Sequence, residues 1–134
     1  MMRKPERRSR AGKAKQAGLP LVRPIAWIGG SKDDLSSMPS EVKASFGSRL
    51  FELQRGMSLL DMKPLPQFGA GVYELRERFE RNAYRVMYVV NLIKAIYVLH
   101  AFMKKSKSGI GLPKPDAELI AARLRRAQEQ DTED

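Results

Sequence analysis

The stretch between residues 72 and 107 most constrains the fold, because three short runs rich in β-branched and aromatic residues follow one another there. The runs cover residues 72–79 (VYELRERF), 83–91 (AYRVMYVVN) and 95–107 (AIYVLHAFMKKSK). Turn-prone residues such as Asn82 separate them, which is typical of strands joined by short connections. The sequence therefore predicts a three-stranded antiparallel meander that ends in a cluster of lysines.

Side-chain alternation along these strands places two arginines away from the core. Successive side chains of a strand point to opposite faces, so Arg76 lies on the face opposite Leu75. By the same rule, Arg85 lies opposite Val86. A strand face that carries cations instead of apolar side chains is suited to binding a phosphate chain. The candidate phosphate-binding residues are Arg76, Arg85, His100, Lys104, Lys105 and Lys107.

These residues also have a purely structural interpretation, which the sequence leaves open. His100 alternates with apolar residues and is equally typical of a buried sheet histidine. The lysine run at 104–107 is, on its own, more typical of a solvated loop. The acidic partners available to the two arginines are Glu74 or Glu77 for Arg76, and Glu80 for Arg85.

The segment before the meander predicts an edge strand followed by two helices. Pro20 and Pro24 lack the N–H that a central strand needs, so a strand centred on residues 25–28 is expected at an edge of the sheet. Ser31 is expected to cap a short helix that begins at Lys32.

A second helix is predicted over residues 40–56. Its apolar residues recur at helical spacing, and Gly56 stands where a C-cap glycine belongs. The two helices would form a hairpin that covers one face of the sheet. The residues of the apolar stripe are Val42, Phe46, Leu50 and Leu53.

A last helix is predicted over residues 115–130, with Arg123 on its outer side or margin. Residues 129–134 include four acids and are expected to fray. The order is one strand, two helices, three consecutive strands and a helix. This order predicts an α+β fold with a small, mostly antiparallel sheet.

The net charge of +10 is concentrated near one end of the 134-residue chain. Residues 1–24 hold eight Lys or Arg and one Glu, so they carry +7, and the other 110 residues carry +3. Residues 1–18 lack apolar periodicity and are interpreted as a disordered basic arm before a domain over 19–134. The arm is either a nonspecific nucleic-acid tether or a solvated tail. A basic chain favours RNA, DNA, the ribosomal surface or an acidic protein as partner.

Composition excludes several classes of site. The chain has no cysteine and a single histidine, which leaves little for a transition metal, and no cofactor motif follows a strand. No apolar run approaches the roughly 18 residues that span a bilayer. We therefore expect a cytoplasmic protein without metal or cofactor.

Several motifs carry a resemblance that spans residues 25 to about 128. They are WIGGSKDDL (27–35) with PSEV (39–42), KPLPQFGAGVYELR (63–76), YRVMYVV (84–90), and YVLHAFMKKSKSG (97–109) with PKPDAELIAARL (113–124). In this order they resemble the phage-derived, HigB-like branch of the RelE/ParE toxin superfamily, whose members belong to type II toxin-antitoxin systems.

The resemblance implies a RelE-like fold and a metal-independent mRNA endoribonuclease that acts on the translating ribosome. It also implies a cognate antitoxin encoded next to the toxin, typically a helix-turn-helix protein. Such an enzyme activates a ribose 2′-OH against the adjacent phosphate. The implied catalytic residues are Arg76, Arg85, His100, Lys104 and Lys105, and the implied RNA-binding residues are Lys63, Lys107 and Arg123.

Two other functions remain open at the level of sequence. The same superfamily includes ParE-like inhibitors that bind DNA gyrase without cutting RNA, and a prophage-derived homologue can lose activity while still binding its antitoxin. A basic phage packaging or architectural protein is a third interpretation, which rests mainly on the arm.

Overall fold

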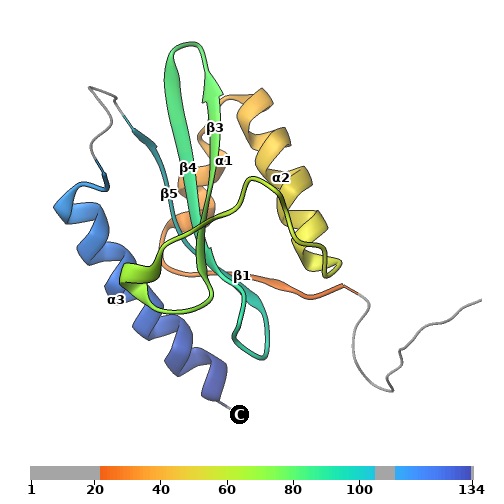
Figure 1. Cartoon of the computed structure of the whole chain (residues 1–134), viewed down its shortest axis with the longest axis vertical. Helices are drawn as coiled ribbons and strands as arrows, with labels where there is room; N and C mark the ends of the chain where they lie inside the picture. Colours follow the sequence, from red (N-terminus) through yellow and green to blue (C-terminus); the bar gives the residue numbers. More distant parts are fainter. Residues whose placement is uncertain (1–21, 105–110, 134) are drawn as a thin grey trace, which may run out of the picture.

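The computed structural model describes residues 22–104 and 111–133, and five strands within them form one mixed sheet (Figure 1). The sheet order is β1-β5-β4-β3-β2, in which β1 is parallel to β5 and the other neighbours are antiparallel. The predicted α+β class, the mostly antiparallel sheet and the edge position of the first strand are confirmed. The strands are β1 (Ile25–Trp27), β2 (Lys63–Pro64), β3 (Val72–Phe79), β4 (Asn82–Val89) and β5 (Ile96–Lys104).

The hairpin of β3 and β4 turns earlier than the sequence suggested. The strands pair without interruption from Val72 opposite Val89 to Phe79 opposite Asn82, so Asn82 begins β4 instead of forming the turn. The two turn residues are Glu80 and Arg81, with φ of 49° and 71°. Positive φ at both positions is the geometry of a type I′ turn, whose twist matches that of the strands.

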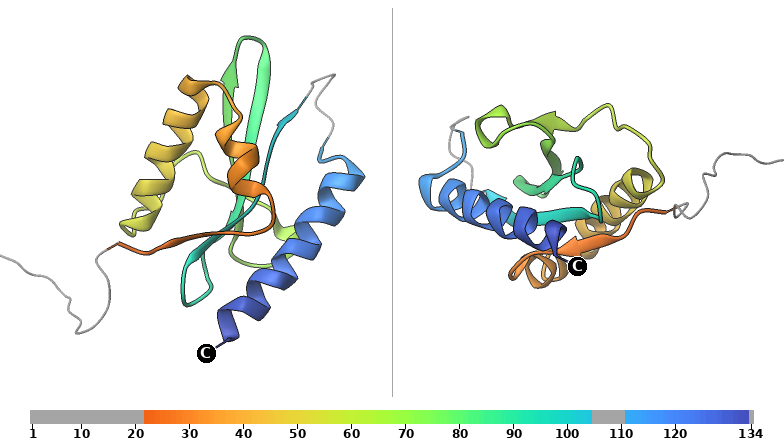
Figure 2. Two further views of the ribbon diagram at one scale, coloured as in Figure 1. Left: turned by 180° about the vertical axis from the view of Figure 1, so that it is seen from behind. Right: turned by 90° about the horizontal axis from the view of Figure 1, so that it is seen from below.

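Two helices cover one face of the sheet, as predicted (Figure 2). α2 (Ser40–Gln54) buries its predicted apolar stripe against β3 and β4. It ends in a Schellman motif, in which the N–H of Gly56 donates to Leu53 O and the N–H of Met57 donates to Glu52 O. Gly56 has a φ of 84°, which explains the glycine.

α1 (Ser31–Ser36) corrects the prediction for Ser31. Ser31 is the first residue of the helix, follows Gly30 as N-cap, and has no exposed surface. Its hydroxyl donates to the carbonyl of Val98 on β5, at 3.1 Å, instead of capping the helix. The helix is packed against the sheet, so the hydroxyl satisfies a strand carbonyl where β1 ends.

The loop after α2 contains two short elements that the sequence did not predict. They are β2 and the 3₁₀ helix η1 (Pro66–Phe68). β2 places Lys63 opposite Glu74 of β3. This pairing adds a fifth strand at the edge of the sheet and brings the predicted basic loop residue beside the meander.

α3 (Lys114–Thr132) packs on the other face and extends two residues beyond its predicted end. The prediction that residues 129–134 fray is wrong for residues 129–132, because these residues continue the helix. Asp131 is buried, and its carboxylate accepts hydrogen bonds from the N–H groups of Ile93 and Lys94, at 2.9 and 2.7 Å, and from the hydroxyl of Tyr97, at 2.9 Å. The last turn of α3 is therefore tied to the turn between β4 and β5.

Three parts of the sequence predictions fall outside the described residues. They are the basic arm over 1–18, the lysines Lys105 and Lys107, and the final residue. Across residues 22–104 and 111–133, none of the helices is both long and apolar enough to cross a membrane.

Candidate functional site

The register of the sheet places five predicted site residues on one face. Residues directly opposite on neighbouring strands share a face. Arg76 lies opposite Arg85, which lies opposite Phe102 of β5. Parallel to this row runs a second one, from Lys63 through Glu74 and Met87 to His100. We call the part of the sheet that carries Lys63, Glu74, Arg76, Arg85, His100, Phe102 and Lys104 the cationic face.

Arg85 forms a buried ion pair with Glu74 on this face. The exposed fraction is 3% for the Arg85 side chain and 0% for the Glu74 side chain, and Arg85 Nε donates to Glu74 Oε2. This contact replaces the predicted alternative of a pair with Glu80. The guanidinium also lies over the ring of Phe102, 5.4 Å from its centroid. Its NH1 group is buried without a hydrogen-bond partner among the described residues, so one donor of this guanidinium is unsatisfied in the fold.

Arg76 is the more accessible of the two arginines. Half of its side chain is exposed, and its Nε lies 3.4 Å from Glu74 Oε1. Glu77, the other predicted partner, points to the opposite face and pairs with Arg49 of α2 at 2.8 Å. The cationic face therefore combines one fixed, buried guanidinium with one exposed guanidinium, both beside the same carboxylate.

His100 is buried, as its structural interpretation predicted, with 6% of the residue exposed. Its Nε2 lies 2.8 Å from Asp116 Oδ1 in the first turn of α3, and its ring stacks on Phe102 with a centroid distance of 4.8 Å. Its Nδ1 has no partner among the described residues. The imidazole thus joins α3 to the cationic face, and both the imidazole and the Arg85 guanidinium lie against the ring of Phe102.

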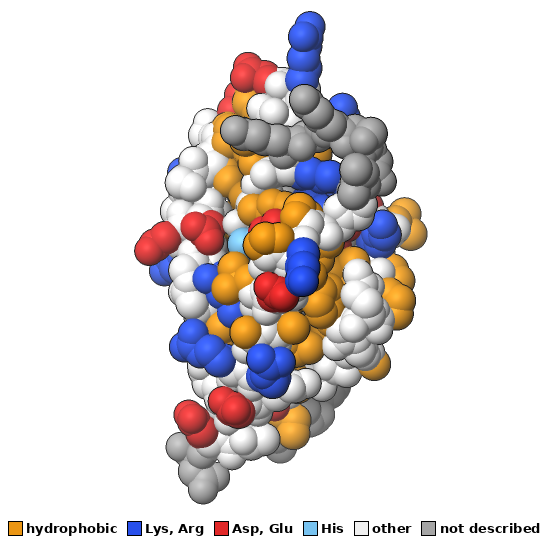
Figure 3. All heavy atoms as spheres, turned by 90° about the vertical axis from the view of Figure 1, so that its left-hand side faces the viewer, with side chains coloured by type: hydrophobic (Ala, Val, Ile, Leu, Met, Phe, Trp, Pro, Cys, Tyr) orange, Lys and Arg blue, Asp and Glu red, His pale blue; other side chains and the backbone are white. Residues whose placement is uncertain are grey.

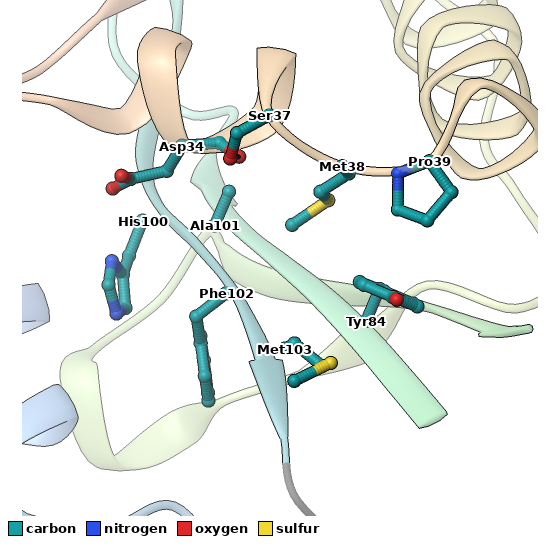
Figure 4. A pocket seen from close by; sticks show the side chains of 9 residues that line it. All are labelled: Asp34, Ser37, Met38, Pro39, Tyr84, His100, Ala101, Phe102 and Met103. Carbon is teal, nitrogen blue, oxygen red and sulfur yellow. Dashed lines mark hydrogen bonds between the residues drawn. The ribbon is translucent and has the colours of Figure 1, made fainter. Parts of the chain in front are cut away.

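A groove of about 430 Å³ runs beside the cationic face, along the edge of β5 beyond its pairing with β1. Figure 4 shows the rings of His100 and Phe102 extending from β5 in one direction, while Asp34 of α1 and Ser37, which follows α1, lie above them. Figure 3 views this side of the molecule and shows hydrophobic side chains at the centre, with both basic and acidic side chains among and around them. The other residues that line the groove are Met38, Pro39, Tyr84, Ala101 and Met103.

The lysines of the predicted site flank the arginines. Lys63 is exposed on β2, and Lys104 is partly exposed at the end of β5, opposite Ala83. Arg78 shares this face, because it also pairs with Ala83, and sequence reasoning missed it. Period-two spacing from Arg76 was the signal that would have found Arg78, and the same spacing places Glu74 on the face.

Arg123, which was predicted on the outer side or margin of the last helix and as an RNA-binding residue, is partly exposed and contacts the backbone of β5. Its NH1 donates to the carbonyl of Leu99 at 3.0 Å. Its guanidinium also lies against Gly29, where an added Cβ would come within 2.7 Å of Arg123 Nε. Arg123 thus fastens the middle of α3 to β5 and to the turn after β1.

No cluster of three or more metal-binding side chains occurs in the part of the chain that the structure describes. The cationic face itself carries guanidinium, ammonium, imidazole and carboxylate groups. Together these groups can bind a phosphate and stabilise negative charge that develops on it.

Comparison with known proteins gives one family. Neither the curated proteins nor the solved structures contain a match to this chain. The sequence model of the family described as "Phage derived protein Gp49-like (DUF891)" matches residues 33–125, which include α2, the whole meander and most of α3. Because the match covers more than half of the 134 residues, the chain belongs to the Gp49-like family of phage-derived proteins.

Proposed function

We propose that this protein is the toxin of a type II toxin-antitoxin system and cleaves mRNA as a metal-independent endoribonuclease on the ribosome. The Gp49-like family is a toxin-like group, which supports the class of protein. The observation that carries the proposed activity is the pair of opposed arginines on the cationic face, one buried with an unpartnered NH1 and one half exposed.

The proposed reaction is an attack of a ribose 2′-oxygen on the adjacent phosphorus. The new bond closes a 2′,3′-cyclic phosphate, and the bond to the 5′-oxygen of the next nucleotide breaks. The transition state carries more negative charge on its phosphoryl oxygens than the ground state does. Arg76 and Arg85 would stabilise this charge, while Lys63 and Lys104 would hold the neighbouring phosphates.

The reaction also needs a base for the 2′-OH and an acid for the leaving oxygen. His100 is the candidate among the described residues, because an imidazole ring can both accept and donate a proton. Its Nε2 is engaged by Asp116, which fixes the orientation of the ring beside Phe102. Growth inhibition would follow from loss of translated mRNA, and an antitoxin encoded next to the toxin would silence it.

Induced expression with primer extension on an abundant mRNA tests the proposal. We expect discrete cuts within translated codons for the intact chain and at least a 100-fold loss of cutting for Arg76→Ala, because the exposed guanidinium acts on the transition state. Arg55→Ala is the matched control, since Arg55 caps α2 and stacks on Phe51, away from the cationic face. It should cut as the intact chain does.

The same experiment separates the alternative functions. Growth arrest without mRNA cuts would overturn the endoribonuclease and favour a gyrase inhibitor, which a DNA supercoiling assay would then reveal. Absence of both cuts and growth arrest would indicate an inactive homologue that retains only antitoxin binding.

A further inference from the structure

Glu74 is an acidic residue with no exposed surface in the middle of the cationic face. It lies two residues before Arg76 on β3, and Arg76 lies directly opposite Arg85 of β4. Like charges that face each other on neighbouring strands destabilise a sheet. A carboxylate beside both guanidinium groups offsets this repulsion. Glu74 therefore allows two arginines to occupy opposed positions that their mutual repulsion would otherwise disfavour.

The two carboxylate oxygens of Glu74 make different contacts with the two arginines. Oε2 accepts the hydrogen bond from Arg85 Nε, so the Nε edge of that guanidinium is occupied and its direction is fixed. Oε1 accepts no hydrogen bond and lies 3.4 Å from Arg76 Nε, so Arg76 is held only by charge and keeps half of its side chain exposed. The carboxylate thus fixes Arg85 and leaves Arg76 free to close on a ligand.

We propose that Glu74 is a positioning residue of this site, which orients Arg85 rigidly and Arg76 loosely toward one phosphodiester. The proposal rests on the RNA cleavage proposed above. The three side chains together carry a net charge of +1, which matches the single negative charge of a phosphodiester. The charge that appears in the transition state is then met by the Arg85 guanidinium, whose direction is already set, and by Arg76, which closes on the ligand.

Glu74→Asp tests the proposal, because it keeps the charge but withdraws the carboxylate by one methylene, about 1.5 Å. In a reconstituted translation reaction with the full chain, we expect kcat for mRNA cleavage to fall about 10- to 100-fold, with KM within about threefold of the intact chain. Glu77→Asp is the matched control, since Glu77 lies on the same strand and pairs with Arg49 on the opposite face. The kcat and the KM of the Glu77→Asp variant should both stay unchanged.

A folded Glu74→Asp variant that cleaves as the intact chain does would overturn the positioning role and leave the endoribonuclease standing. An equal loss of kcat in Glu77→Asp would also overturn it, because the loss would then reflect strand stability alone. Failure of the intact chain to cleave any mRNA would instead overturn the proposed function itself. The two proposals therefore fail in different experiments.

NMR of the arginine Nε–H groups decides the question if Glu74→Asp does not fold. In the intact chain, we expect the Arg85 Nε–H to exchange slowly with water, both alone and with an uncleavable 2′-O-methyl RNA oligonucleotide. The Arg76 Nε–H should shift when that oligonucleotide binds. Rapid exchange of the Arg85 Nε–H, or an oligonucleotide that shifts neither signal, would contradict the proposed arrangement.

Discussion

Two buried carboxylates illustrate what a single residue can do in this fold. Glu74 neutralises guanidinium groups on the cationic face, whereas Asp131 binds two backbone N–H groups and a tyrosine hydroxyl at the end of α3. The sequence offered Glu74 as a partner for Arg76, but it indicated neither the burial of Glu74 and its pair with Arg85 nor the role of Asp131. Asp131 stands among exposed acids of the same type, and Glu74 becomes a central residue only when β3 and β4 pair in register.

Asp131 predicts a dependence of stability on acidity. Burial of its carboxylate opposes ionisation, but the hydrogen bonds from Ile93, Lys94 and Tyr97 and the charge of Lys94 outweigh burial and lower its pKa below the usual 3.8. A carboxylate with a lowered pKa stabilises the fold at pH values above its pKa in the unfolded state. This contribution is lost as the pH falls through its pKa in the folded state. We therefore expect the free energy of unfolding to fall as the pH drops below about 4.

Asp131→Asn should remove part of that dependence. The amide keeps one acceptor oxygen but places an NH₂ group against a backbone N–H, so we expect a loss of about 2 kcal/mol at pH 7. Urea unfolding at pH 7 and pH 3 measures both effects, with the exposed Glu129→Gln as control. A loss of equal size at both pH values would show that the charge of Asp131 plays no part.

At the scale of elements, the strands and helices followed from the sequence because hydrophobic periodicity is local. The apolar stripe of α2 and the three runs of the meander were located within a few residues. Ser31 and the turn were misplaced for a different reason. The position of Ser31 depends on packing against Val98, and the turn at Glu80 and Arg81 lacks the Asn or Gly that usually marks positive φ.

The turn predicts a stabilising substitution. Arg81 holds a φ of 71° at a cost that glycine avoids, so Arg81→Gly should raise the free energy of unfolding by about 0.5 to 1 kcal/mol. Arg78→Gly in the same hairpin should lower it by a similar amount, since Arg78 lies within the strand. Thermal unfolding compares the two, and a destabilising Arg81→Gly would rule out strain in the turn.

At the scale of the whole molecule, charge is distributed unevenly. Residues 1–18 hold seven Lys or Arg and one Glu, whereas the cationic face carries only a few cations in fixed places. We therefore expect residues 1–18 to attract RNA over a distance and the cationic face to position one phosphate. The sequence predicted most of the described cations on this face, but not Arg78 and not the burial of Arg85, which depends on contacts between three strands.

Removal of residues 2–18 tests this separation. Each phosphate contact to single-stranded RNA contributes about 0.7 to the slope of log affinity against log salt, so the deletion should lower that slope by about 2 to 4. Titration of a single-stranded RNA at several salt concentrations measures the slope. Primer extension should show the same cut positions, and altered positions would assign part of the specificity to the arm.

The attachment of α3 has a consequence for how the molecule opens. His100 and Asp116 join its first turn to β5, Arg123 joins its middle, and Asp131 joins its last turn to the β4–β5 connection. A helix that is attached at both ends and in the middle has no loosely held end at which local unfolding could begin. It should leave the sheet in one cooperative step, so the backbone amides of Ile93 and Lys94 exchange with solvent only as rarely as the whole domain unfolds.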